Sequence, residues 1–108
     1  MKNIAFLMDK QGLWSLAPAF DMTYSYSPSG DWTATHQMTL NGKRNGFAMA
    51  DFKACAKIGT MKRGRAEAIV EEVTSVVARW PQFAVEVRVS DDVSGKIQKT
   101  HRLSFSDV

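Results

Sequence analysis

The hydrophobic pattern at the start of the chain has the period of a β-strand. Apolar side chains alternate along residues 4–8, which is typical of a strand buried on at least one face. Residues 9–12 have the composition of a turn, in which Gly12 can adopt a positive φ. The apolar run at 13–16 then predicts a returning strand, and Pro18 ends it because proline has no amide for the ladder. The pattern predicts a hairpin with a loop of about four residues.

From residue 47 onward the apolar period changes from two to 3.6. Residues 47–58 predict a first helix, with Asp51 near its N-terminus, where the helix dipole favours a negative charge, and Gly59 ending it. The second helix is the clearest element of the sequence. Its apolar stripe consists of Ala66, Ile69, Val70, Val73, Val76, Val77 and Trp80.

The last third of the chain is less regular. Pro81 ends the second helix and is well placed to begin another. Residues 82–89 fit either a strand or a short helix, and we favour the helix because an isolated final strand would need a partner edge. Ser90 marks the start of a last helix, with Val93, Ile97 and either His101 or Leu103 facing inward. Residues 103–108 are expected to fray.

The segments between these elements are polar. Residues 22–31 have loop composition, and Asn41-Gly42 and Asn45-Gly46 are turn dipeptides. Lys43 and Arg44 between the two turns are either solvated or phosphate ligands. Lys62, Arg63 and Arg65 are expected in the first turn of the second helix, at the unfavourable end of its dipole. That cluster indicates a partner, a nearby carboxylate or a tolerated surface group.

Composition limits the class of protein. A chain of 108 residues with 44% hydrophobic and 23% charged residues is one soluble domain. A net charge of +3 permits anionic partners without requiring them. The single cysteine, Cys55, rules out an internal disulfide, and the first apolar run is too short for a signal peptide or a membrane span. We therefore expect a cytoplasmic protein of the α+β class, mainly α. Its parts are an N-terminal hairpin segment at 1–46, packed on a subdomain of three to four helices at 47–108.

Two polar residues flank the predicted hairpin. Asn3 stands before it and Asp21 after it. An amide oxygen and a carboxylate are hard ligands, and together they suit Mg²⁺ bound with substrate phosphates. The alternative is that Asp21 is a turn or cap residue.

Several blocks resemble the HipA family of serine/threonine kinases, the toxins of bacterial type II toxin–antitoxin pairs. These blocks are Lys2-Asn3, Gln11-Gly12, Leu16–Asp21 followed by Thr23-Tyr24-Ser25, Met38–Arg44, Ala50-Asp51-Phe52 and Ala78–Phe83. The resemblance covers nearly the whole chain but only the C-terminal part of a full family member, within a kinase-like C-lobe. It implies that Asn3 is the metal-binding asparagine at the end of the catalytic loop. It also implies that Asp21 binds Mg²⁺ on the ATP phosphates, as the DFG aspartate of protein kinases does.

The resemblance also implies what this sequence does not contain. In kinases the catalytic aspartate lies five residues before that asparagine, and five before Asn3 falls ahead of Met1. No catalytic residue is therefore assigned, and we expect a fragment that is inactive alone. Mg²⁺ and ATP would be the cofactors of a complete enzyme, and two alternatives stay open for this chain by itself: that it binds them without the N-terminal lobe, or that it binds neither.

Three functional hypotheses follow. The first is the C-terminal fragment of a HipA-like kinase, with the remaining kinase portion as its partner. The second is a non-catalytic interaction module for a HipB-like DNA-binding antitoxin or another subunit. The third, a helix-turn-helix at residues 47–79 that binds DNA, is disfavoured by the half-acidic face of the second helix and the low charge. We expect no direct contact with nucleic acid and none with a membrane.

Overall fold

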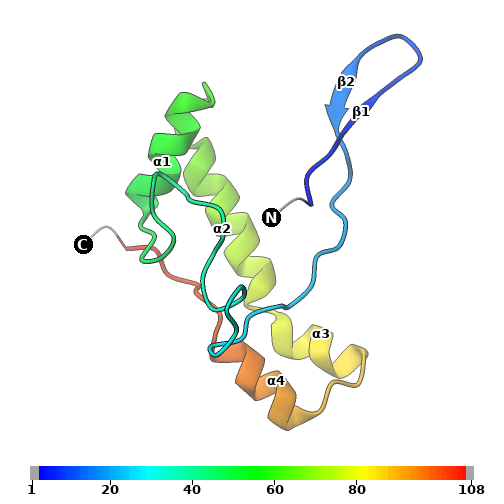
Figure 1. Cartoon of the computed structure of the whole chain (residues 1–108), viewed down its shortest axis with the longest axis vertical. Coiled ribbons are helices and arrows are strands. Elements are labelled where there is room, and N and C mark those ends of the chain that lie inside the picture. Colours follow the sequence, from blue (N-terminus) through cyan, green and yellow to red (C-terminus); the bar gives the residue numbers. More distant parts are fainter. Residues whose placement is uncertain (1–2, 107–108) are drawn as a thin grey trace. The chain divides into compact units, whose positions relative to one another are not determined.

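The computed structural model describes residues 3–106, and its backbone falls into two compact units that divide between Thr39 and Leu40. The elements are two strands followed by four helices (Figure 1). This order confirms the predicted α+β, mainly helical class with an N-terminal hairpin.

The first unit contains an antiparallel hairpin of β1 (Phe6–Met8) and β2 (Trp14–Leu16). Asp9 organises the five-residue loop between them, because its Oδ1 accepts hydrogen bonds from the amides of Gln11 at 2.8 Å and Leu13 at 2.9 Å. Gly12 has a φ of 82°, as the turn sequence predicts. Residues 22–39 form turns and bends without a helix or strand, in agreement with their loop composition.

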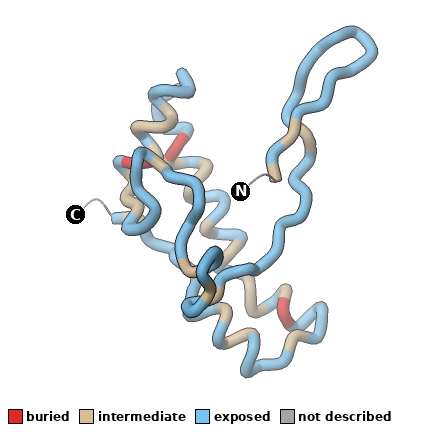
Figure 2. The backbone as a smooth tube through the Cα atoms, in the orientation of Figure 1, coloured by how far each residue is buried: buried red, intermediate tan, exposed pale blue. Residues whose placement is uncertain are grey.

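The prediction that the hairpin is buried on one face is wrong. Every residue of β1 and β2 is exposed, and Figure 2 shows the hairpin coloured as exposed along its strands and loop. Alternation of apolar residues records which face is apolar, but it does not show that a covering layer is present.

In the second unit, α1 (Met49–Ile58) and α2 (Arg65–Val77) pack side by side (Figure 1). Gly59 ends α1 as predicted. Gly64 precedes α2 with a φ of 81°, a left-handed conformation that favours glycine. Lys62 and Arg63 therefore lie before α2, and the prediction that they occupy its first turn is wrong.

The remaining helices are α3 (Trp80–Glu86) and α4 (Asp91–Gln98), which pack against each other. Pro81 lies in the first turn of α3 and Ser90 precedes α4, as predicted. Residues 82–86 are helical, which settles the ambiguity between strand and helix. The indole Nε1 of Trp80 donates a hydrogen bond to the carbonyl of Ser94 at 3.1 Å and so links the two helices.

The segment after α4 is held rather than frayed over its described part. The ring of Phe105 meets that of Phe52 edge to face, with centroids 5.1 Å apart. The amide of Met49, in the first turn of α1, donates to the carbonyl of Phe105 at 3.1 Å. The expectation of fraying is wrong for this segment, and residues 107–108 lie outside the described part. Val93 is exposed, so its predicted inward position is also wrong.

Candidate magnesium and nucleotide site

The two predicted metal ligands meet at the open end of the hairpin. The antiparallel pairing of β1 with β2 continues outward to the bond from the Ala17 amide to the Ala5 carbonyl at 2.9 Å. Residues just beyond this pair are thereby brought together. The side-chain amide of Asn3 donates through Nδ2 to the backbone carbonyl of Asp21 at 2.9 Å. Residues 18 apart in sequence thus share one hydrogen bond.

This contact leaves the oxygen ligands available. Asn3 uses its NH₂ group for Asp21, which leaves Oδ1 as an acceptor. Within residues 3–106, the carboxylate of Asp21 makes no hydrogen bond or ion pair, and its residue is exposed. One carboxylate and one amide oxygen fit Mg²⁺, which keeps several waters and binds proteins through few side chains plus substrate phosphates.

The backbone of Asp21 has an uncommon conformation. Its φ is 53°, in the left-handed region that costs most side chains about 1 kcal/mol but that aspartate and asparagine adopt more readily. Residues with such backbone conformations cluster at functional sites, which agrees with a functional position for Asp21 but does not define its role. No group of three or more His, Cys, Asp or Glu side chains that could hold a metal occurs in the described part of the chain. A cation at Asp21 would therefore depend on phosphate and water for its other ligands.

A second polar cluster lies in the helical unit, around Asp51. Asp51 is only 2% exposed and accepts three hydrogen bonds. They come from Asn41 Nδ2 at 2.9 Å, Lys43 Nζ at 2.8 Å and the amide of Ala48 at 2.9 Å. Because Ala48 is the residue before α1, the last bond caps the helix. The cluster therefore fastens the turn at 40–43 to the start of α1.

Charge and hydrogen bonding act together on Asp51. The bond from Lys43, then the amide of Ala48, then Asn41 lower the pKa of the Asp51 carboxyl from 3.8 to about 2. The sequence predicts Asp51 near the N-terminus of the helix, where the dipole favours a negative charge, but it does not connect Asp51 to Lys43, for which it predicts either a solvated side chain or a phosphate ligand. Lys43 is the ion-pair partner of Asp51. An aspartate at the third helical position after an Asn-Gly-Lys turn is the signal that could have indicated this pairing.

The basic cluster of Lys62, Arg63 and Arg65 makes no ion pair within the described part of the chain. In the described residues, the ion pairs join Lys43 to Asp51, Lys53 to Glu67 and Lys96 to Asp92. None includes Lys62, Arg63 or Arg65. The nearby-carboxylate explanation of the cluster is therefore not supported, and a tolerated surface group or a partner remains.

The fold is of the mainly helical α+β class, and Asn3 and Asp21 meet at the open end of its hairpin. Residues 1–80 match the model of the HipA-like C-terminal domain, and the chain belongs to that family. The match contains Asn3, Asp21 and the Asp51 cluster, and it ends at the start of α3. It confirms the resemblance found in the sequence.

No match was found among curated proteins or among solved structures. In the part of the chain that the structure describes, no helix has both the length and the apolar character needed to cross a membrane.

Proposed function

We propose that this chain forms the Mg²⁺- and ATP-binding C-terminal portion of a HipA-like serine/threonine kinase toxin and transfers no phosphoryl group by itself. The observation that carries the proposal is the hydrogen bond between the Asn3 side chain and Asp21. It holds together the two residues that the family resemblance selects as metal ligands. Membership of the HipA-like family supports the same assignment.

The chemistry assigned to these residues is electrostatic. Bound Mg²⁺ would neutralise charge on the ATP phosphates during transfer. Asp21 would supply a negative oxygen ligand, and Asn3 would supply a neutral one while its NH₂ group holds the Asp21 backbone. Kinase catalysis consists mostly of positioning and charge stabilisation. Metal binding by itself does not orient a substrate hydroxyl for attack, so these two ligands alone would not give turnover.

Paramagnetic broadening tests the metal site directly. With Mn²⁺ and ATP as the probe, we expect the NMR amide signals around Asp21 and Asn3 to broaden first. Asp21→Asn should remove the effect, because asparagine tolerates the left-handed backbone but loses the charge. Asp31→Asn is the matched control, since it removes the same charge from an exposed loop residue of the same unit. Equal broadening in both variants would contradict the assignment of Asp21.

A phosphorylation assay tests the expected inactivity. The purified chain with Mg²⁺ and radiolabelled ATP should label neither itself nor a generic protein substrate. Addition of a polypeptide that carries the family's catalytic loop is expected to be required for any labelling. Turnover by the chain alone would refute the inactive-fragment proposal.

A second candidate is a non-catalytic module that binds an antitoxin or a partner subunit. It is favoured by the large apolar side chains exposed on the hairpin, including Phe6, Trp14 and Leu16. Co-purification with a HipB-like DNA-binding protein, in the absence of nucleotide and unaffected by Asp21→Asn, would favour the module over the kinase portion. Binding that requires Mg²⁺ and ATP would favour the kinase portion.

A further inference from the structure

Two Asn-Gly dipeptides precede α1, and the structure holds them differently. They are Asn41-Gly42 and Asn45-Gly46. In such a dipeptide the backbone nitrogen of glycine can attack the side-chain carbonyl of asparagine and close a five-membered imide, because glycine has no Cβ to hinder the approach. In the described part of the chain, a Cβ added at either glycine would meet nothing within 4 Å. Steric access therefore does not distinguish the two sites.

The first dipeptide is locked in a tight turn. Leu40 and Lys43 on either side of it exchange both backbone hydrogen bonds, at 2.9 and 3.0 Å. The φ angle is positive at both central residues, 50° at Asn41 and 76° at Gly42, as in a type I′ turn. The Asn41 side chain also donates through Nδ2 to Asp51 at 2.9 Å. Imide closure would have to rotate Asn41 out of this turn and break its bond to Asp51.

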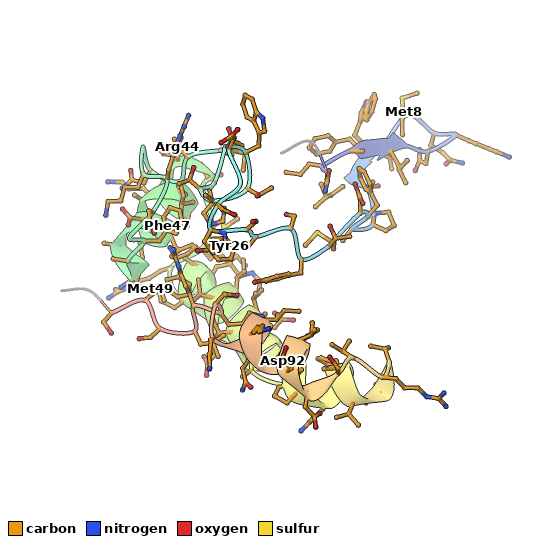
Figure 3. All side chains as sticks on the ribbon, turned by 60° about the horizontal axis from the view of Figure 1, so that its bottom comes forward. Met8, Tyr26, Arg44, Phe47, Met49 and Asp92 are labelled. Atoms are coloured by element: carbon orange, nitrogen blue, oxygen red, sulfur yellow. The ribbon has the colours of Figure 1, made fainter. Side chains whose placement is uncertain are left out.

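The second dipeptide presents the reacting groups to each other. It lies between Arg44 and Phe47, both labelled in Figure 3. The amide of Gly46 donates to Asn45 Oδ1 at 2.8 Å, so the attacking nitrogen already faces the carbonyl that it must attack. Within the described residues, no backbone-to-backbone hydrogen bond holds residues 45 and 46, and Asn45 Nδ2 makes no hydrogen bond. The NH₂ group that must leave is therefore unrestrained.

A cation contacts the same carbonyl oxygen. Arg102, in the segment after α4, donates through Nη1 to Asn45 Oδ1. When the Gly46 nitrogen attacks Asn45 Cγ, negative charge develops on Oδ1, and a cationic donor already placed there stabilises that charge. Two donors at one atom also identify it as the oxygen of the Asn45 side chain, because the NH₂ group cannot accept.

We propose that Asn45 is a site of spontaneous deamidation in the folded chain, promoted by Arg102, and that Asn41 is protected from the same reaction. Solvent base removes the Gly46 amide proton, and the nitrogen forms a bond to Asn45 Cγ. The Cγ–Nδ2 bond then breaks, and ammonia leaves with a proton from solvent. Water adds to either carbonyl of the imide and opens it to aspartate or isoaspartate. The net reaction is hydrolysis of one amide to a carboxylic acid and ammonia.

The modification changes the charge of this loop. A carboxylate at position 45 converts the hydrogen bond with Arg102 into an ion pair and lowers the net charge of +3 by one. At position 41 the same reaction would place a second carboxylate beside Asp51, which repulsion between like charges disfavours. The inference goes beyond the proposed function and needs neither Mg²⁺ nor ATP.

Peptide mapping by mass spectrometry tests the proposal. The purified chain is incubated at mildly alkaline pH, and conversion at each asparagine is followed by the mass increase from amide to acid. In the folded chain we expect Asn45 to react at least about tenfold faster than Asn41. In guanidinium chloride, which removes the turn and the Arg102 contact, the two rates should agree within about threefold. Equal rates in the folded chain, or an unchanged ratio in denaturant, would overturn the proposal.

Variants of Arg102 test the role of the cation. Arg102→Gln should slow the reaction at Asn45 by about threefold or more, and Arg102→Lys should retain most of the wild-type rate. Arg63→Gln is the matched control, because it removes the same charge from another exposed residue of the same unit. A variant that fails to fold is recognised by faster reaction at Asn41. An unchanged Asn45 rate in folded Arg102→Gln would overturn the assignment of Arg102.

Discussion

Asp51 is a single carboxylate that joins two backbone segments. Lys43 and Asn41 reach it from a turn, and the amide of Ala48 reaches it from the helix start. A buried charge is tolerated only when it is paired and hydrogen-bonded, and here Lys43 supplies the charge and all three donors supply hydrogen bonds. Asp51 thus has a structural role in joining the turn at 40–43 to the start of α1.

Asp51→Asn should destabilise the helical unit. Asparagine keeps one acceptor but loses the ion pair and presents an NH₂ group to donors. We expect the midpoint of thermal unfolding to fall by about 5 °C, the order of change that loss of a helix cap produces in a small domain. The midpoint is measured by following the circular dichroism of the helices at 222 nm during heating. Asp92→Asn is the control, because its ion pair with Lys96 is exposed and should change the midpoint little. Equal shifts in both variants would count against the cluster.

The same cluster predicts a pH dependence. The pKa of Asp51 is about 2 in the folded chain and ordinarily 3.8, so the unfolded state binds the proton more readily. The stabilisation from Asp51 is therefore complete above about pH 3.8 and is lost as the pH falls towards 2. The difference in unfolding midpoint between wild type and Asp51→Asn should stay constant at neutral pH and shrink through that window. A constant difference down to pH 2 would contradict the lowered pKa.

At the scale of elements, α3 is helical because a local signal, Pro81, acts together with tertiary contacts of Trp80. Residues 82–89 alternate like a strand, yet Pro81 in the first turn and the contacts of Trp80 favour a helix. The Trp80 indole binds the Ser94 carbonyl in α4, and its ring meets His101 edge to face at 6.1 Å. The buried Ala84 of α3 allows close approach. A small side chain and one indole thus hold the α3–α4 pair together.

Trp80→Phe should therefore weaken the α3–α4 pair. The substitution removes the indole donor and leaves the Ser94 carbonyl without this bond, which costs about 1 kcal/mol of unfolding free energy. Urea unfolding followed by circular dichroism measures the change. Trp32→Phe is the matched control, because the Trp32 side chain is highly exposed and only its backbone carbonyl accepts a bond, from Gln37. A loss in Trp32→Phe as large as in Trp80→Phe would refute this role.

At the scale of the whole molecule, the two units have different sources of stability. The buried residues of the described part of the chain are Asp51, Ala66 and Ala84, all in the helical unit. The hairpin has no buried side chain, and its ladder is solvated on both faces. Local opening should therefore be easier in the hairpin than in α2.

Hydrogen exchange checks this difference in stability. We expect the ladder amides of β1 and β2 to exchange at least about tenfold faster than the central amides of α2. Equal protection of hairpin and α2 would contradict the independent stability of the units.

Most of the fold was predictable because its signals are local. The turn at Asp9–Gly12, the stripe of α2, the proline of α3 and the serine before α4 each act within a few residues. The pairing of Asn3 with Asp21 was also within reach, since a hairpin brings its two ends together whatever lies around it. The metal-ligand roles of both residues remain predictions.

What the sequence determined by itself was therefore the order and type of the elements and the membership of the HipA-like family. Tertiary structure alone decided that Lys43 pairs with Asp51, that Phe105 holds the segment after α4 on α1, and that the residues of β1 and β2 are exposed. Periodicity reports which side chains are apolar and when a helix begins, because those properties depend on near neighbours. Burial and ion pairing depend on groups distant in sequence, so they appear only when the chain is folded.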